Sequence, residues 1–342
     1  MCSFRVIFFR IMIEMIGKKC AFALIISTVF FWQNAFACVD KFALSSVDAR
    51  VHKQRNAKAI YLQQEHFNKM DNYIAIDIIN ANISELCEGM VQNFQHLETL
   101  ILINLNLTLI EPGTFRDLPK LKHLSLSVNK IPSVPARTFN LIKSLQVLYL
   151  SKNEIETIEE GAFSNMPNLK AVHLEHNKIS HLNGDIFVNS PKLSLINFNF
   201  NRLNRITTSS FADIQPGFGV RALNIFLKKN QISEIEAGSF KQPIPINLHL
   251  QYNELVQVPS VIFSMVNGST LSVDNNRVSC IADDIIERLQ IQNIAVNLKN
   301  NPVNCGCMKR IDEILSDREL KGELNVETTE FCLENYPGNN YK

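Results

Sequence analysis

Histidine and aromatic residues recur in the middle of the sequence, and histidine is a common metal ligand. His173 and His176 have the spacing of a metal-binding pair on a helix, but they fall on a predicted strand and the turn after it. The sequence contains no Gly-x-Ser-x-Gly, His-Glu-x-x-His or phosphate-loop motif. We therefore predict a protein that binds a partner and is not an enzyme, with no catalytic residues, no metal site and no cofactor.

The candidate binding residues recur at one position of a repeating pattern and at positions close beside it. Aromatic residues on a rigid, exposed surface are typical anchors of protein interfaces. The alternative is that single aromatic residues only cover neighbouring leucines. The residues predicted to bind are Tyr149, His173, Asn197, Phe226 and His249, with Glu175, Phe200 and Tyr252 beside them.

A leucine and asparagine repeat must position these residues. The pattern Leu121-x-x-Leu124-x-Leu126-x-x-Asn129-x-Ile131 returns three times, shifted by 24 residues each time. Looser copies extend it in both directions, which gives ten units over Tyr73–Val303. Between Leu193 and Ala222 the period lengthens to 29, and the extra residues predict an extruded loop in which Phe218 is either an exposed contact or tucked in.

Each residue type in the repeat has a physical role. The alternating leucines predict a short strand with one apolar face, and stacking of identical strands buries those faces in a parallel sheet. Asparagine has both a donor and an acceptor, so a column of asparagines can satisfy buried backbone groups where the chain leaves each strand. A second apolar column is predicted to fill the interior behind the sheet: Phe115, Phe139, Phe163, Phe187, Phe211, Phe240 and Phe263.

The N-terminus has the features of a signal peptide at residues 1–37. Lys18 and Lys19 precede Cys20–Trp32, a run without charges, and Ala35-Phe36-Ala37 fits a cleavage site. The true start could be Met15. The alternative, a membrane anchor, would need a run of about 20 apolar residues. We expect a secreted, extracellular protein without a stable membrane anchor.

Charge and cysteine content narrow the classes of partner. The formal net charge of +1 includes +3 from residues 1–37, which leaves −2 for the mature chain. A nearly neutral chain offers no electrostatic reason to bind nucleic acid or an anionic membrane.

Six cysteines remain after residue 37, and in an oxidising compartment an even number predicts three disulfides: Cys38, Cys87, Cys280, Cys305, Cys307 and Cys332.

These motifs resemble the extracellular class of leucine-rich repeats, including the segment before its phenylalanine, as in Glu160-Gly161-Ala162-Phe163. The resemblance covers about two-thirds of the chain. It implies an α/β-type solenoid, a horseshoe with a concave parallel sheet of about ten repeats and disulfide-capped ends. We assign residues 38–72 to the N-terminal cap, 73–303 to the repeats and 304–342 to the C-terminal cap with a short tail.

Asn301–Cys307 resembles the start of the family's C-terminal cap, followed by a helix in which Ile311, Ile314 and Leu315 share a face. One cysteine of the usual four is missing. Cys280 and Cys305 occupy the same position of successive repeats, so we expect them to pair. The family's cap implies Cys307–Cys332, and Cys38–Cys87 would remain. A metal bound by the Cys-x-Cys pair is the less favoured alternative, because no histidine cluster lies nearby.

Asn82, Asn106 and Asn267 begin glycosylation sequons. The whole pattern resembles insect extracellular leucine-rich-repeat proteins, and among them the coil-less mosquito leucine-rich immune proteins. That resemblance implies a role in innate immunity and an extracellular protein partner, such as a complement-like factor, or a pathogen-surface ligand. The alternative function is cell adhesion, guidance or ligand binding like that of a Toll receptor. The sequence leaves the oligomeric state open.

Overall fold

The computed structural model describes residues 49–52, 60–62, 74–184, 186–211, 214–240, 243–291, 294–316 and 324–325. The chain divides by its internal contacts into two compact units, Met1–Ser45 and Ser46–Lys342, and every described residue belongs to the second. The predicted signal peptide lies outside the described residues, and so does most of the predicted N-terminal cap.

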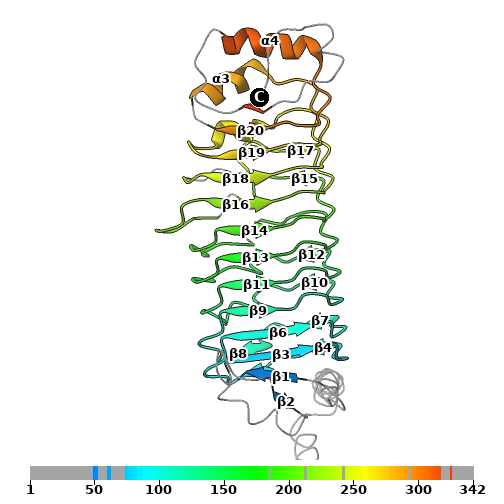
Figure 1. Ribbon diagram of the computed structural model, residues 1–342. Helices are drawn as coiled ribbons and strands as arrows, with labels where there is room; N and C mark the ends of the chain where they lie inside the picture. Colours follow the sequence, from blue (N-terminus) through cyan, green and yellow to red (C-terminus); the bar gives the residue numbers. More distant parts are fainter. Residues whose placement is uncertain are drawn as a thin grey trace, which may run out of the picture. The chain divides into compact units, whose positions relative to one another are not determined.

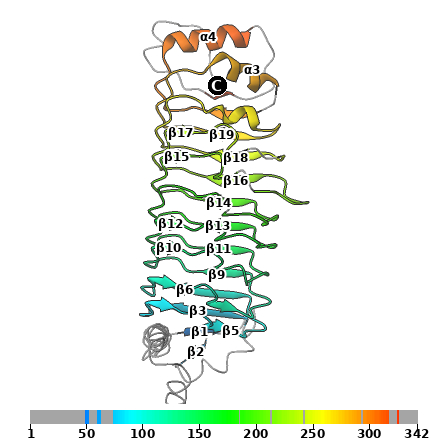
Figure 2. The same cartoon turned by 180° about the vertical axis from the view of Figure 1, so that it is seen from behind.

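The second unit is a stack of short strands joined by turns, with two helices near its C-terminal end (Figures 1 and 2). The main sheet has 13 strands. In sheet order they are β2 (Ile60–Leu62), β1 (Ala49–His52), β3 (Ala75–Ile79), β6 (Thr99–Ile103), β9 (His123–Ser125), β11 (Val147–Tyr149), β13 (Ala171–His173), β14 (Leu195–Asn197), β16 (Leu223–Phe226), β18 (Ile246–His249), β19 (Thr270–Ser272), β20 (Ala295–Asn297) and β21 (Leu324–Asn325).

From β3 to β20 the main sheet is parallel, with one strand for each repeat read in the sequence. β1 pairs antiparallel with β2 and with β3, so the residues described in the predicted N-terminal cap extend the sheet at its first edge. The predicted parallel solenoid is therefore confirmed.

In the described part of the chain, four pairs of short strands form outside the main sheet, in the segments that lead from one strand of the main sheet to the next. β10 and β12, and β15 and β17, pair in parallel across successive repeats, and β4–β7 and β5–β8 do the same nearer the N-terminus. Their bounds are β4 Glu85–Leu86, β5 Val91–Gln92, β7 Leu109–Ile110, β8 Phe115–Arg116, β10 Ser133–Val134, β12 Thr157–Ile158, β15 Arg205–Ile206 and β17 Glu234–Ile235.

The core lies between the main sheet and these return segments. Leu124 and Leu126 are fully buried, while Ser125 between them is partly exposed, as the alternation predicts. The phenylalanine column is buried from Phe115 to Phe240, and its rings stack on one another along the solenoid, as with Phe139 and Phe163 at 6.2 Å between ring centroids.

Phe263, the last member predicted for this column, does not belong to it. Its side chain is 40% exposed. The segment there forms the 3-10 helix η2 (Ser260–Ser264), which turns Val261 and Ile262 into the core in its place. The sequence spacing is kept, but a tighter backbone turn changes which side chain faces inward.

Buried asparagines join each repeat to the one before it. The Oδ1 atom of Asn177 accepts from the backbone N–H of Ile155 at 3.0 Å. Its Nδ2 atom donates to the carbonyls of Leu174 and Leu150 at 2.9 and 3.0 Å. Equivalent bonds recur from Asn129 to Asn301. The predicted column therefore satisfies backbone groups of two successive turns at once.

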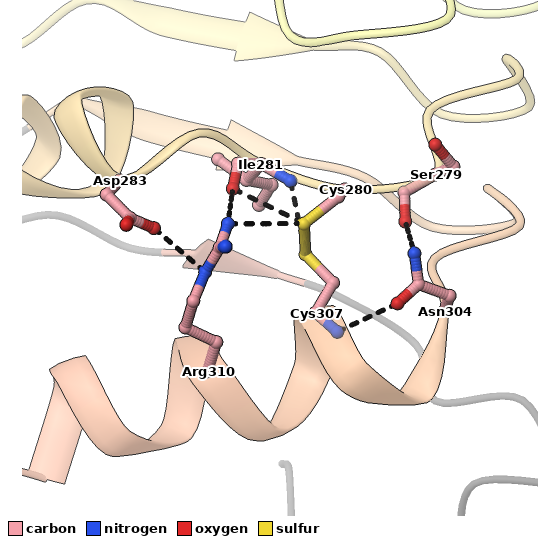
Figure 3. Close-up of a disulfide and its surroundings, with 7 residues drawn as sticks. All are labelled: Ser279, Cys280, Ile281, Asp283, Asn304, Cys307 and Arg310. Atoms are coloured by element: carbon pink, nitrogen blue, oxygen red, sulfur yellow. Dashed lines mark hydrogen bonds and ion pairs between the residues drawn. A yellow bond between two sulfur atoms is a disulfide. The ribbon is translucent and has the colours of Figure 1, made fainter.

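The C-terminal end of the stack is covered by α3 (Asp283–Ile291) and α4 (Cys305–Ser316). Here the expected pairing of Cys280 with Cys305 is wrong, because Cys280 bonds to Cys307, with the two Cα atoms 5.4 Å apart (Figure 3). The expected pairing of Cys307 with Cys332 fails with it. Cys87 and Cys305 are also disulfide-bonded, and the predictions for Cys38 and Cys332 lie outside the described residues.

The reason is that the repeat register stops at Asn304 and a helix begins. The Asn304 Oδ1 atom accepts from the backbone N–H of Cys307 at 2.8 Å, as a helix N-cap does, and its Nδ2 atom donates to the carbonyl of Ser279 at 3.0 Å (Figure 3). Two residues along a helix are rotated by about 200°. Only one of the two cysteines can then face Cys280, and that one is Cys307.

Candidate binding face

The five predicted strand residues form one row across the main sheet. The paired registers place Tyr149 beside His173, His173 beside Asn197, Asn197 beside Phe226 and Phe226 beside His249. We call these five residues the strand row. Tyr149 is 36% exposed and the other four are partly exposed. Each ends its strand with its side chain on the face opposite the leucines, so the sheet brings the predicted residues together.

The rings of the strand row are stacked in pairs. Tyr149 and His173 lie 4.7 Å apart between centroids with an interplanar angle of 16°. Phe226 and His249 lie 4.5 Å apart at 3°. Asn197 separates the two pairs. Stacking of this kind fixes side chains without further contacts, because a ring on one strand is held by the ring one strand further on.

A second row follows the strands, three residues after the first, and consists of His176, Phe200, Lys229 and Tyr252. All four have a left-handed backbone, with φ between 56° and 59°. The same conformation recurs at this position in every central repeat, where it turns the chain out of the strand. The side chains consequently project from the face, and we call these four residues the turn row.

The turn row is a continuous stack of rings and a cation. His176 and Phe200 stack at 4.2 Å and 15°. The Nζ atom of Lys229 lies 4.9 Å from the centroid of Phe200 and 5.5 Å from that of Tyr252. Lys228 adds a second amine 5.1 Å from the Tyr252 ring. Cation–π contacts of this length are attractive and hold the lysines against the rings.

Lys228 and Lys229 are the residues of this face that the sequence reasoning missed. They lie beyond the lengthened repeat, and a pair of lysines is usually only a solvated part of the surface. The signal that could have found them is the repeat register itself, since Lys229 falls at the same position as Phe200 and Tyr252 in the repeats on either side.

Glu175 lies between the two rows and faces a histidine of the strand row. Its Oε2 atom is 3.8 Å from His173 Nδ1 and is buried without a hydrogen-bond donor. Burial lowers the pKa of His173 below its ordinary value of 6.5, and the carboxylate of Glu175 raises it part of the way back. Burial alone lowers the pKa of His249. Burial therefore favours the uncharged form of both rings.

The structure also places several other features predicted from the sequence. Within the described residues, no group of three His, Cys, Asp or Glu side chains is arranged to hold a metal ion. No helix of the described part is both long and apolar enough to cross a bilayer. Phe218 is fully exposed. The segment that leads into β16 extends beyond the neighbouring turns (Figure 1). The sequon residues Asn82, Asn106 and Asn267 are also exposed.

The family model described as "Leucine rich repeat" matches residues 74–131 and 124–179. The solenoid is built of leucine-rich repeats. Beyond residue 179 the leucine-rich repeats continue in the same sheet and with the same asparagine bonds. No curated protein sequence matches the chain.

Solved structures share the leucine-rich-repeat fold. A chain of the mouse RP105/MD-1 complex is 23% identical with a TM-score of 0.57, over 70% of this chain and 40% of that one. A chain of the glycosylated Drosophila Toll–Spatzle complex is 18% identical with a TM-score of 0.56, over 74% and 39%. The chain thus spans about two-fifths of the length of these two relatives.

A third structure carries the resemblance to insect leucine-rich immune proteins. The leucine-rich repeat domain of APL1B, a mosquito protein, is 18% identical with a TM-score of 0.50, over 71% of this chain and 75% of that one. At identities this low, the likeness of all three structures concerns the fold.

Proposed function

We propose that this chain is a secreted protein of innate immunity that binds a protein partner through the strand row and the turn row. The observation that carries the proposal is the pair of parallel rows, in which aromatic rings and cations are held in place by stacking on a rigid sheet. Rigid aromatic anchors bind with a small loss of conformational entropy. Catalysis has no comparable support, because the sequence contains no Gly-x-Ser-x-Gly, His-Glu-x-x-His or phosphate-loop motif.

The comparisons support a protein partner by analogy. Two of the similar structures are complexes by their titles, RP105 with MD-1 and Toll with Spatzle, and the second is described as a hub in Drosophila development and innate immunity. Secretion is supported by the predicted signal peptide and by the disulfide at the C-terminal cap. Glycans at Asn82, Asn106 and Asn267 would fit the same route.

A glycan placed on the strand row tests the proposal. Asn199→Thr creates the sequon Asn197-Phe198-Thr, and glycosylation of Asn197 would cover the middle of the row. Asn199→Val is the matched control, since valine has the shape of threonine but makes no sequon. Both variants also remove the acceptor that Asn199 Oδ1 offers to the N–H of Lys228 at 2.7 Å.

The protein and its two variants would be secreted from a glycosylating host, and the added glycan verified by mass. We expect the wild type and Asn199→Val to retain the same partner from extracellular fluid of the source organism, and Asn199→Thr to lose it. Retention of that partner by the glycosylated variant would reject the strand row as the binding face.

The alternative, an adhesion or guidance protein, shares the same face and differs in when the protein is made. An immune factor should rise in body fluid after infection, whereas a guidance ligand should follow a tissue pattern. Unchanged protein levels after infection, measured in body fluid by immunoblot, would favour the alternative.

A further inference from the structure

The stacked rings of this face present their rims to a partner, and each ring covers one face of its neighbour. Partners such as Phe226 and His249 lie on adjacent strands with nearly parallel planes, so each ring covers one face of the other and their edges point out of the sheet. His176 and Phe200 are arranged in the same way. Because a benzene ring has a negative face and a positive edge, the rims of Phe200 and Phe226 are electropositive, and each neutral histidine beside them adds one N–H donor.

The cations of the turn row strengthen this potential because they are not neutralised. Among the described residues, no carboxylate oxygen lies within 4.0 Å of the Lys228 or Lys229 amine. Some lysines elsewhere on the stack are paired with a carboxylate, as Lys122 is with Glu98 at 3.1 Å and Lys178 with Glu154 at 2.7 Å. Rings hold the two amines in position but leave their charge available.

The face as a whole is more basic than the chain. The outward strand positions and the turn beside them, from residue 74 to residue 302, hold more basic residues than acidic ones, while the mature chain is slightly acidic. The basic residues are Lys122, Lys130, Lys152, Lys170, Lys178, Arg202, Lys228, Lys229, Arg277 and Lys299, and the acidic ones are Asp77, Glu98, Glu154, Glu175, Glu254 and Asp274.

We infer that the partner presents an acidic peptide segment, whose carboxylates bind Lys228 and Lys229 and the aromatic rims beside them. This inference rests on the proposed function and names the chemistry of its partner. A neutral glycan is disfavoured at the turn row, because sugars stack on ring faces and the Phe200 ring has His176 on one side and Lys229 on the other. Carboxylates suit the two lysines, because a carboxylate accepts charge-assisted hydrogen bonds from an amine. They also suit the rims of the phenylalanine rings, which are electropositive.

A pair of matched variants isolates this site. Lys229→Asn removes the amine, and asparagine accepts the left-handed backbone found there. Lys152→Asn is the control, because Lys152 holds the same position three repeats before Lys229, has φ of 54° and stacks on no ring of the described residues. Both variants remove one positive charge at a residue with a left-handed backbone. They differ in that Lys229 contacts two aromatic rings and Lys152 contacts none among the described residues.

The probe is a fluorescent peptide of alternating glutamate and serine, with a second peptide in which glutamine replaces glutamate. Fluorescence anisotropy with the full mature chain should show tighter binding of the glutamate peptide. Lys229→Asn should weaken it about tenfold, and Lys152→Asn less than about twofold. Raising NaCl from about 0.05 to about 0.5 M should weaken the wild type more than Lys229→Asn, since salt screens exposed charges.

No binding of the glutamate peptide, equal binding of the glutamine peptide, or equal losses in the two variants would overturn the inference. Preference for a heparin-derived hexasaccharide over the glutamate peptide, lost in Lys229→Asn, would overturn it in favour of a sulfated glycan. These failures leave the proposed function standing if Asn199→Thr still blocks partner capture. The proposed function itself would be rejected by a different result, namely that the glycosylated Asn199→Thr variant still retains the partner.

Discussion

His249 shows what the sheet does to a single residue. Its ring lies flat on Phe226, and burial lowers its pKa below 6.5. A histidine of the unfolded chain binds its proton at the ordinary pKa. The unfolded chain therefore takes up protons more readily than the folded one as the pH falls below 6.5, and the difference works against folding.

We expect the free energy of unfolding to be highest above pH 6.5 and to fall as the pH is lowered from there. His249→Gln should make this fall shallower, because one of the groups that titrate differently in the two states is gone. The measurement is urea unfolding at pH 7.5, 6 and 5, with His181→Gln as a matched control at an exposed position. An identical pH dependence in wild type and His249→Gln would contradict the burial argument.

Asn177 carries three hydrogen bonds to buried backbone groups, and alanine can replace none of them. Each buried group left without a partner costs about 1–3 kcal/mol. Asn177→Ala should therefore lower the free energy of unfolding by about 3 kcal/mol or more, as measured by urea unfolding. Asn204→Ala, the same change at an exposed position, is the control, and a similar loss there would show that the asparagine column is not the cause.

At the scale of the elements, the repeat could be predicted because a single strand cannot bury its leucines and a stack of them can. Leu124, Asn129 and Phe139 keep their phase in the sequence, and the structure places all three in the core. The prediction failed where the chain changes its backbone geometry. At Phe263 a 3-10 helix rotates the side chain outward, and at Cys305 an α-helix begins and gives Cys280 a different partner.

The candidate face could be predicted only in part. Register alone placed Tyr149 and His173 in one row, because parallel strands align equivalent positions. It did not reveal that Lys229 is held between two rings, since that contact joins repeats separated by an insertion. The set of residues that bind depends on the partner as well as on this chain. A pattern within one sequence therefore cannot identify that set.

The Cys280–Cys307 disulfide ties α4 to the last repeats and closes a loop with a sequence separation of 27 residues. Crosslinks of this length stabilise by about 3.5 kcal/mol in the loop-entropy account. Replacing both cysteines by serine should speed amide hydrogen exchange in α3 and α4 and leave the central strands β11 and β13 slow. Mass spectrometry of exchange measures this.

Lys309→Ala, on the exposed side of the same helix, is the control for a change in α4 that keeps the disulfide. Exchange that rises equally in β11 and in α4 after loss of the disulfide would contradict a local role of the cap. In that case the whole stack would open as a single unit.

The whole described stack is held by contacts between each turn and the next. The asparagine bonds, the ring stacks and the sheet registers all join neighbouring repeats. Stability in such a molecule is approximately a sum of repeat terms and nearest-neighbour terms. The two rows of the binding face share this arrangement, because each ring is fixed by the ring or the amine one repeat away.

The asparagine bonds have a consequence for how such a chain can change over generations. Asn177 contacts its own turn and the turn before it, and Asn201 repeats the pattern one turn later. A gene duplication of one whole unit would therefore insert a rung whose donors and acceptors already match those above and below. The ligand surface could lengthen by one ring or one charge at each such event, while the seams on either side stay hydrogen-bonded. The repeat before β16 is longer than the others, so a copy of that repeat would also add a second projecting loop.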